Sequence, residues 1–121
     1  MKTALIVDDS ETIRNEVRRA LAQAGFAVTE ARDGAEGLKA AMGRSDISLI
    51  VLDVNMPVMN GLDMLDRLRE DPQGAAIPVL LLTTEAQDTL VERAKKAGAK
   101  GWLVKPVKPE MLVLAANRLA R

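Results

Sequence analysis

The strongest constraint on the fold of this chain is a set of five short apolar runs that recur at similar intervals. They are ALIV at 4–7, FAV at 26–28, ISLIVL at 47–52, IPVLLL at 77–82 and GWLV at 101–104. The third and fourth runs are continuous rather than alternating, which is typical of strands covered on both faces. We therefore predict five strands at these positions.

The segments between the runs have a helical period. In four of them, apolar residues three or four positions apart form a stripe: Ile13, Val17, Ala20, Leu21 and Ala24; Leu62, Leu65 and Leu68; Leu90, Ala94 and Ala97; Leu112, Ala115, Ala116 and Leu119. Gly25 and Gly98 fit helix ends, Asp71-Pro72 ends another helix, and Pro109 fits the start of the last. A weaker helix is predicted at 35–42, with a glycine inside it.

This order, a strand and then a helix five times over, predicts an α/β protein. The expected architecture is a doubly wound (βα)5 parallel sheet with helices on both faces. Right-handed crossovers leave few topologies for such a chain. No linker, repeat or low-complexity stretch interrupts the 121 residues, so we expect residues 1–121 to form a single domain.

Polar residues that can do chemistry follow four of the five runs. Asp8 and Asp9 follow the first, Asp53 the third, Thr83 the fourth and Lys105 the fifth. In parallel α/β sheets, ligands bind beyond the carboxyl ends of the strands, so these side chains are predicted to converge. Singly, an aspartate here is most often a turn or cap residue, and a lysine before proline a solvated loop residue. Their joint occurrence favours a site.

Three carboxylates in one place favour a bound cation. Without one, their repulsion raises the pKa of at least one carboxyl group. Because the chain contains no histidine or cysteine, its ligands are oxygen atoms, which select a hard ion such as Mg²⁺. A metal beside Asp53 would neutralise an approaching phosphoryl group, Lys105 would add positive charge and Thr83 a hydrogen bond. Asp53 is therefore the candidate nucleophile.

The composition argues against several other functions. Without cysteine or histidine, disulfides, thiolate chemistry and a Ser-His-Asp triad are excluded. Lys plus Arg (17) equals Asp plus Glu (17), so no net basic charge favours nucleic-acid binding. No apolar run has the length of a signal peptide or a membrane span. We expect a cytoplasmic protein with no membrane insertion.

Four segments match a known family in their order and spacing: VDDS at 7–10, LDVNMPVMNG at 52–61, LLTTEA at 81–86 and GWLVKP at 101–106. The chain resembles the receiver domains of bacterial two-component response regulators, and looks close to the single-domain, CheY-like chemotaxis subtype. The resemblance implies a flavodoxin-like fold with strand order 2-1-3-4-5. It also implies a signalling switch that catalyses only its own phosphorylation and dephosphorylation, with no output domain in residues 1–121.

The resemblance assigns roles to individual residues. Asp53 would accept a phosphoryl group from a phosphohistidine on a partner, a sensor histidine kinase. Asp9 and Asp53 would bind Mg²⁺ directly, Asn55 through its backbone carbonyl, and Asp8 largely through water. The Lys105-Pro106 bond is usually cis in this family, an isomer that proline makes accessible.

Further residues would respond to the phosphoryl group. By resemblance, Thr83 would turn toward its oxygens and Lys105 would pair with them. Asn55 and Glu85 lie where the family sets how long the phosphoryl group survives, and this pair predicts a short-lived phosphoform. Both residue types are also common in loops and at helix starts for capping alone. Thr84 stands where Ala or Gly is usual, and would narrow access for water or small phosphodonors.

The family's output face comprises the helix before the fifth strand, that strand and the last helix. Here it offers a basic patch with an aromatic anchor, Lys95, Lys96, Lys100 and Trp102. This patch suits an acidic or amphipathic segment of a downstream protein target. Basic residues at a helix end are also good partners of the helix dipole alone. Trp102 replaces the usual Tyr or Phe, and is predicted to stay outward or to pack on the neighbouring helix. We expect a monomer.

Three alternatives are weighed against the phosphorylated switch. A phosphorelay intermediate would hand the phosphoryl group to another histidine. A docking receiver would act without phosphorylation, but every expected site residue is present, which argues against it. A phosphatase of the haloacid dehalogenase type also forms a phosphoaspartate, but it needs a second Asp two positions after the nucleophile, where this chain has Asn55.

Overall fold

The centre of the molecule is a parallel sheet of five strands. The computed structural model describes residues 1–56, 59–84 and 87–121. Its strands are β1 (Thr3–Val7), β2 (Ala27–Ala31), β3 (Ile47–Asp53), β4 (Val79–Thr83) and β5 (Gly101–Val104). Their order in the sheet is β2-β1-β3-β4-β5, and each neighbouring pair is parallel. The predicted α/β class and the strand order 2-1-3-4-5 are confirmed.

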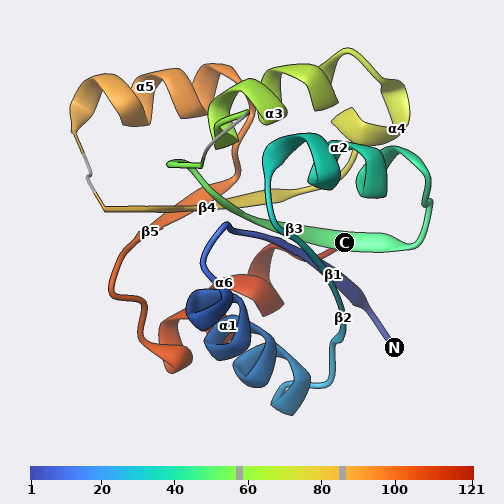
Figure 1. Cartoon of the computed structure of the whole chain (residues 1–121), viewed down its shortest axis with the longest axis vertical. Coiled ribbons are helices and arrows are strands. Elements are labelled where there is room, and N and C mark those ends of the chain that lie inside the picture. The colour runs from blue at the N-terminus through green and yellow to red at the C-terminus, as the bar shows by residue number, and fades with distance from the viewer. Residues whose placement is uncertain (57–58, 85–86) are drawn as a thin grey trace.

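Helices cover both faces of this sheet. They are α1 (Glu11–Gln23), α2 (Gly34–Met42), α3 (Gly61–Arg69), α4 (Pro72–Ala75), α5 (Asp88–Lys96) and α6 (Pro109–Leu119). Figure 1 shows α1 and α6 on one face, and α2, α3, α4 and α5 on the other. Within the part of the chain that is described, no helix has the length and apolar character needed to cross a membrane.

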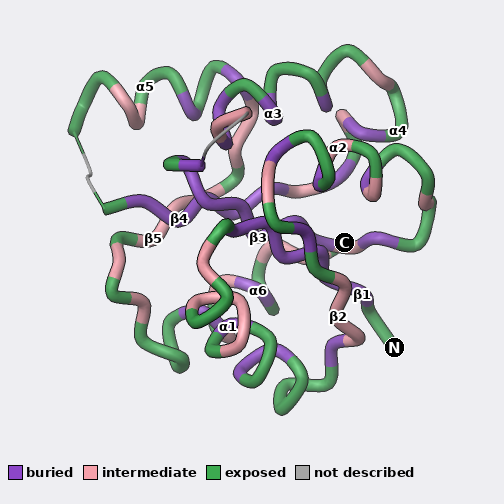
Figure 2. Tube along the Cα trace, viewed as in Figure 1, coloured by how far each residue is buried: buried purple, intermediate pink, exposed green. Residues whose placement is uncertain are grey.

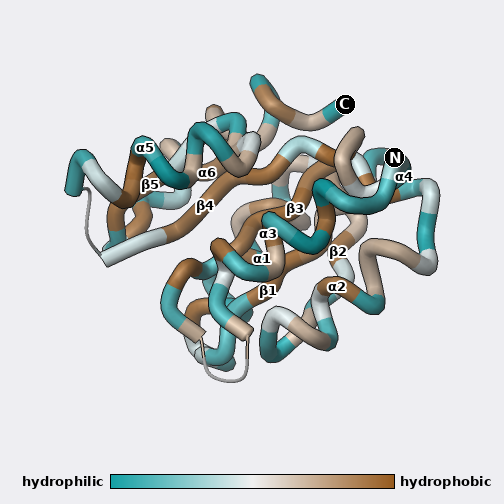
Figure 3. Tube along the Cα trace, turned by 90° about the horizontal axis from the view of Figure 1, so that it is seen from above, coloured by the Kyte–Doolittle hydropathy of each residue, from teal (hydrophilic) through white to brown (hydrophobic). Residues whose placement is uncertain are grey.

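Alternate residues of the strands form two hydrophobic cores, one on each face. In β1, Ala4 and Ile6 join the core under α1 and α6, whereas Leu5 and Val7 join the core under the other helices. The three central strands, β1, β3 and β4, are almost entirely buried (Figure 2), and they are among the most hydrophobic parts of the trace (Figure 3). Every residue of β4 is buried, which explains why its run is continuous in the sequence.

The second strand is the element whose boundaries the sequence predicted least well. The apolar run at 26–28 marked its start, but β2 begins after Phe26 and extends to Ala31. Because β2 is an edge strand, with β1 as its partner, it accommodates polar residues such as the half-buried Thr29 and the exposed Glu30. Phe26 itself is 6% exposed and lies in the core beneath α1 and α6.

The short helix α4 was not predicted, because Asp71-Pro72 was interpreted only as the end of the preceding helix. The same dipeptide starts a new helical turn. The Asp71 side chain accepts a hydrogen bond from the backbone N–H of Gly74 (2.9 Å), and Pro72 occupies the first position of the turn. The prediction of five helices is therefore corrected to six among the described residues.

Candidate metal centre at the carboxyl edge of the sheet

The sheet order brings the predicted site residues together. Because β1 and β3 are neighbours, with Val7 paired to Leu52, the residue that follows β1 lies beside the last residue of β3. These two residues are Asp8 and Asp53. The next strand in the sheet is β4, which ends at the buried residue Thr83. The convergence predicted from the strand ends is confirmed.

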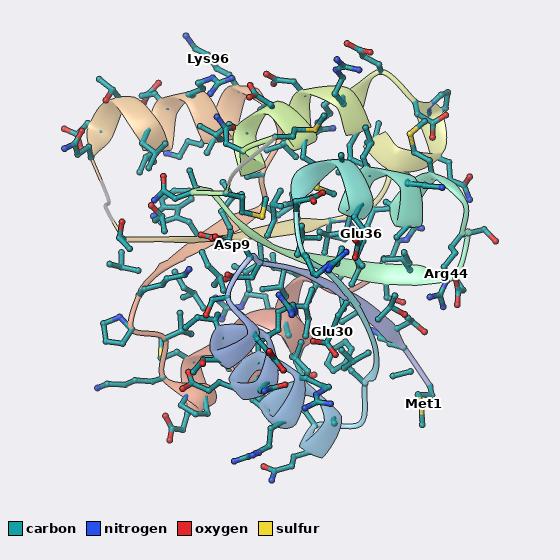
Figure 4. All side chains as sticks on the ribbon, in the orientation of Figure 1. Met1, Asp9, Glu30, Glu36, Arg44 and Lys96 are labelled. Atoms are coloured by element: carbon teal, nitrogen blue, oxygen red, sulfur yellow. The ribbon has the colours of Figure 1, made fainter. Side chains whose placement is uncertain are left out.

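Three carboxylates meet at this edge. Asp8, Asp9 and Asp53 each present an oxygen, and these atoms lie within 4.8 Å of one another. Asp8 and Asp53 are buried, whereas Asp9 is exposed; Figure 4 labels Asp9 in the loop after β1. Consecutive residues of an extended strand point to opposite faces, but the strand ends at Val7 and the chain bends at Asp9. The bend allows both neighbouring acids to serve one site.

This donor set fits a hard divalent cation. All three groups are carboxylates, two are shielded from solvent, and one opens to water. Mg²⁺ typically binds through one or two carboxylates and keeps several water molecules. An exposed third carboxylate is compatible with that requirement. Asp8, Asp9 and Asp53 are thus the residues that would hold the metal.

Lys105 lies between the two buried carboxylates. Its ammonium nitrogen is 3.1 Å from Oδ1 of Asp53 and 3.2 Å from Oδ2 of Asp8. The lysine side chain is 17% exposed, and the two aspartate side chains are 4% and 1% exposed. The peptide bond between Lys105 and Pro106 is cis, as the resemblance implied.

The proximity of these charges perturbs their titration. Burial raises the pKa of Asp53 above its usual value, and the negative charge of Asp8 raises it further. The hydrogen bond and charge of Lys105, together with the backbone N–H of Asn55, lower it only in part. Burial lowers the pKa of Lys105, but its interactions with Asp53 and Asp8 outweigh burial, so the pKa of Lys105 is raised. Repulsion among the carboxylates is therefore only partly offset by Lys105, and the cluster is suited to a further cation.

Arg14 holds the backbone at Asp8, a role that was not predicted from the sequence. Its Nη1 donates a 2.7 Å hydrogen bond to the backbone carbonyl of Asp8, and its Nε lies 3.3 Å from Oε1 of Glu30 on β2. The arginine side chain is only 12% exposed. Arg14 lies beside the apolar stripe of α1, where an arginine looks like an ordinary surface residue.

Two polar residues extend the site beyond Asp53. The backbone N–H of Asn55 donates to Oδ1 of Asp53 (3.3 Å), and its side-chain amide donates to Oγ1 of Thr84 (3.4 Å). Asn55 and Thr84 are both exposed at the mouth of the site. Glu85, which the resemblance assigned to the lifetime of the phosphoryl group, lies outside the described residues.

The residues predicted for a partner face lie on α5, on β5 and in the segment between them. Lys95, Lys96 and Lys100 are exposed, and Figure 4 labels Lys96 on the outer side of α5. The Lys95 ammonium lies 5.5 Å from the ring centroid of Trp102, within the range of a cation–π contact. Trp102 is half-buried against the core beneath α5, so its ring packs on the neighbouring helix.

Comparisons with known proteins agree with this geometry. The family model described as response regulator receiver domain matches residues 4–117. The chain is 38% identical over 109 residues to the chemotaxis protein CheY1 of Helicobacter pylori, covering 89% of this chain and 88% of that protein. The solved structure of the chemotaxis response regulator CheY4 of Vibrio cholerae is 41% identical with a TM-score of 0.92, and the match covers 98% of both chains.

Proposed function

Because this chain belongs to the family of response regulator receiver domains, we propose that it is a phosphorylation-controlled switch in two-component signalling. Asp53 accepts a phosphoryl group from a phosphohistidine of a sensor histidine kinase, and the phosphoform changes how the chain binds a downstream protein. The similarity to CheY1 and CheY4 supports a role in chemotaxis or motility. In this proposal the receiver spans residues 1–121, acts in the cytoplasm as a monomer and signals through a protein partner.

The observation that carries the proposal is the cluster at the sheet edge. Asp53 lies beside two further carboxylates and an ammonium group, with little exposure to solvent. A structural aspartate needs no such neighbours, because a single cap or turn bond would satisfy it. A carboxylate that must attack an anionic phosphoryl group does need positive charge on several sides, since charge repulsion would otherwise oppose the approach.

Each residue of the cluster has its own role in the transfer of the phosphoryl group. An Asp53 oxygen attacks the phosphorus atom, the P–N bond of the donor breaks, and its electron pair stays with the departing imidazole. Mg²⁺, when bound, supplies charge neutralisation to the phosphoryl oxygens. Lys105 transfers its hydrogen bond from the carboxylate to a phosphoryl oxygen, and Thr83 donates its hydroxyl to another. In the return step, water attacks phosphorus, the bond between phosphorus and the Asp53 oxygen breaks, and inorganic phosphate and the free Asp53 carboxylate are released.

The environment of Asp53 also bears on how long the phosphoform lasts. Asn55 and Thr84 lie at the mouth of the site and are joined by a hydrogen bond. We propose a short-lived phosphoform from the Asn55 and Glu85 pair, with Thr84 restricting the approach of water or small phosphodonors. A phosphoform that persists for many hours in the presence of Mg²⁺ would contradict this part of the proposal.

The surface formed by α5, β5 and α6 is the proposed output face. It combines exposed apolar side chains with positive charge: Val104, Met111 and Leu114 are exposed, and Lys100 and Arg118 line a cavity of about 220 Å³ between β5 and α6. This combination suits an amphipathic segment of the partner that carries acidic residues, because apolar burial supplies affinity and charge complementarity supplies orientation.

The proposal is tested by incubating the protein with acetyl phosphate and Mg²⁺ and recording its intact mass. We expect one added phosphoryl group that requires Mg²⁺ and disappears in Asp53→Asn. Asp63→Asn is the matched control, because Asp63 is an exposed carboxylate on α3 outside the cluster. That variant should be phosphorylated like the unaltered protein.

Other results would change the assignment. An adduct that survives Asp53→Asn would place the phosphoryl group on another residue. No adduct, even when beryllofluoride is added and the fluorescence of Trp102 is followed, would favour a docking receiver that works without phosphorylation. Transfer of the phosphoryl group from Asp53 to a second histidine protein would identify a relay intermediate instead of a terminal switch.

A further inference from the structure

We infer that Arg14 is a positioning residue for the two acids of the metal centre, a role that rests on the proposed Mg²⁺-dependent function. Arg14 does not touch the predicted metal ligands through their carboxylates. It acts on the backbone that joins Asp8 to Asp9, through the hydrogen bond to the Asp8 carbonyl. Its side chain is mostly buried beside the site, so it is not an ordinary solvated helix residue.

Arg14 binds the peptide that joins two acids which must serve the same site. Asp8 and Asp9 are consecutive, and consecutive side chains of an extended chain diverge. Both must nevertheless place an oxygen within 4.8 Å of the others. The orientation of the peptide plane between them decides where the second carboxylate points. The carbonyl of this peptide is the group that Arg14 binds at 2.7 Å.

Every polar group of Asp8 is engaged by a different part of the molecule. Its N–H donates to the Ala31 carbonyl at the end of β2 (3.1 Å), and its Oδ1 accepts from the N–H of Ser10 (2.9 Å). Its Oδ2 pairs with Lys105, and its carbonyl accepts from Arg14. Removal of Arg14 would leave the carbonyl as the one unfixed group, and rotation about that peptide would become easier.

The ion pair with Glu30 offsets the charge of Arg14, so Arg14 acts on the site mainly by orienting the backbone. Oε1 of Glu30 lies 3.3 Å from Nε of Arg14, so the arginine belongs to an ion pair, and its field at the carboxylates is reduced. Figure 4 labels Glu30 on the side of the sheet where α1 lies. Arg18, one helical turn further along α1, approaches the other oxygen of Glu30 at 4.0 Å and donates a hydrogen bond to Oδ1 of Asn15.

The two possible roles of Arg14 predict changes of opposite sign. If Arg14 were simply a nearby cation, its removal would relieve repulsion and tighten Mg²⁺ binding. If it positions the acids, its removal weakens Mg²⁺ binding, and the loss of residues that orient metal ligands typically costs 10–100-fold in affinity. We expect the dissociation constant for Mg²⁺ to rise about tenfold in Arg14→Met, at the lower end of that range.

The experiment is a calorimetric titration with MgCl₂ of the unaltered protein, Arg14→Met, Arg14→Lys and Arg18→Met, with urea unfolding of each without metal. Arg14→Lys keeps the charge but replaces the two separate donors Nη1 and Nε by a single ammonium nitrogen. It should weaken binding by about threefold, between the methionine variant and the unaltered protein. Arg18→Met, the control that shares Glu30, should bind Mg²⁺ within twofold of the unaltered protein.

The outcomes separate this inference from the proposed function. Unchanged or tighter Mg²⁺ binding by a folded Arg14→Met variant would overturn the inference alone, as would an equal loss in Arg18→Met. If Arg14→Met does not fold, Arg14→Lys decides, and unchanged binding by that variant would overturn the inference. Absence of Mg²⁺ binding by the unaltered protein would overturn the inference together with the function on which it rests.

Discussion

Replacement of Lys105 by Met should destabilise the protein most when the carboxylate cluster is ionised and no metal is present. The ammonium nitrogen lies within 3.2 Å of an oxygen of Asp8 and of Asp53, and both aspartates are almost fully buried. Methionine keeps most of the stem but removes the charge. Two buried carboxylates would then face each other without the cation that now separates them.

The size of the effect follows from the burial of the pair. Removal of one partner of a buried ion pair typically costs about 3–5 kcal/mol. Because Lys105 is itself 17% exposed, water can replace part of its interaction, so we expect about 3 kcal/mol at pH 7, the lower end of that range. A domain of this size is usually stable by about 5–15 kcal/mol, so the loss would be large and measurable.

The pH dependence has a defined sign. The pKa of Asp53 is already raised in the folded protein, and Lys105 opposes that rise. Without the lysine, the pKa of Asp53 rises further, so the folded state binds a proton that the unfolded state has released. The cost of Lys105→Met should therefore be small near pH 4, close to the unfolded aspartate pKa of about 3.9, and should grow as pH increases toward neutrality.

Urea unfolding with circular dichroism, with and without Mg²⁺, is the assay. The variant should bind Mg²⁺ more tightly, because the metal no longer competes with an ammonium group, and each tenfold gain narrows the gap at high Mg²⁺ by about 1.4 kcal/mol. Lys108→Met is the control, because Lys108 is exposed and its side chain forms no capping bond. A deficit that is equal at pH 4 and pH 7 and unaffected by Mg²⁺ would refute the electrostatic reasoning.

Three further outcomes are expected. Gly98→Ala should lower the free energy of unfolding in urea by at least about 1.5 kcal/mol more than Gly25→Ala. Both glycines have positive φ, but only at Gly98 would a Cβ meet the guanidinium of Arg69, which donates to the Ala97 carbonyl. Equal costs, or an excess that persists in Arg69→Ala, would contradict this. Asp53→Asn should stabilise the metal-free protein above about pH 4, because its raised pKa makes the ionised form less stable when folded; a loss at pH 7 would contradict the sign. The stability that Lys105 contributes should be present below about pH 10.4 and be lost as pH rises through its raised pKa. In thermal unfolding at alkaline pH, the melting temperature of the unaltered protein should therefore fall with pH in a way that Lys105→Met does not show.

The part of the site that lies at the strand ends could be predicted from the sequence. Asp8, Asp53, Thr83 and Lys105 each come at or directly after the end of an apolar run, and parallel strands bring such ends to one edge. No pairing partner had to be known for that argument. The convergence of Asp8, Asp9 and Asp53 therefore followed from order alone, as did the oxygen-only donor set.

Other parts required knowledge of which elements are neighbours. The role of Arg14 depends on β2 lying beside β1, because only then does Glu30 reach its guanidinium. The same holds for Arg93 on α5, which pairs with Asp66 on α3 across 27 positions of sequence. Periodicity places such residues on the polar face of a helix without identifying a partner.

The packing of α5 determines how a change at Asp53 could reach the output face. The space bounded by Thr83, Leu90, Ala94 and Trp102 amounts to about 10 Å³, room for about one water molecule and far less than an indole ring. An inward turn of Trp102 is therefore blocked unless α5 moves.

The ion pairs between α5 and α3 oppose such a movement only weakly. Within α5, Ala94 is the buried residue. The ion pairs between α5 and α3 join Arg93 to Asp63 and to Asp66, at 3.7 and 3.1 Å. All three side chains are about half exposed, and ion pairs of this kind contribute less than about 1 kcal/mol each. If phosphorylation draws Thr83 toward Asp53, we expect α5 to be displaced, because its ion pairs with α3 are weak. Trp102 fluorescence would then report the departure of Lys95 from its ring, not the burial of the indole.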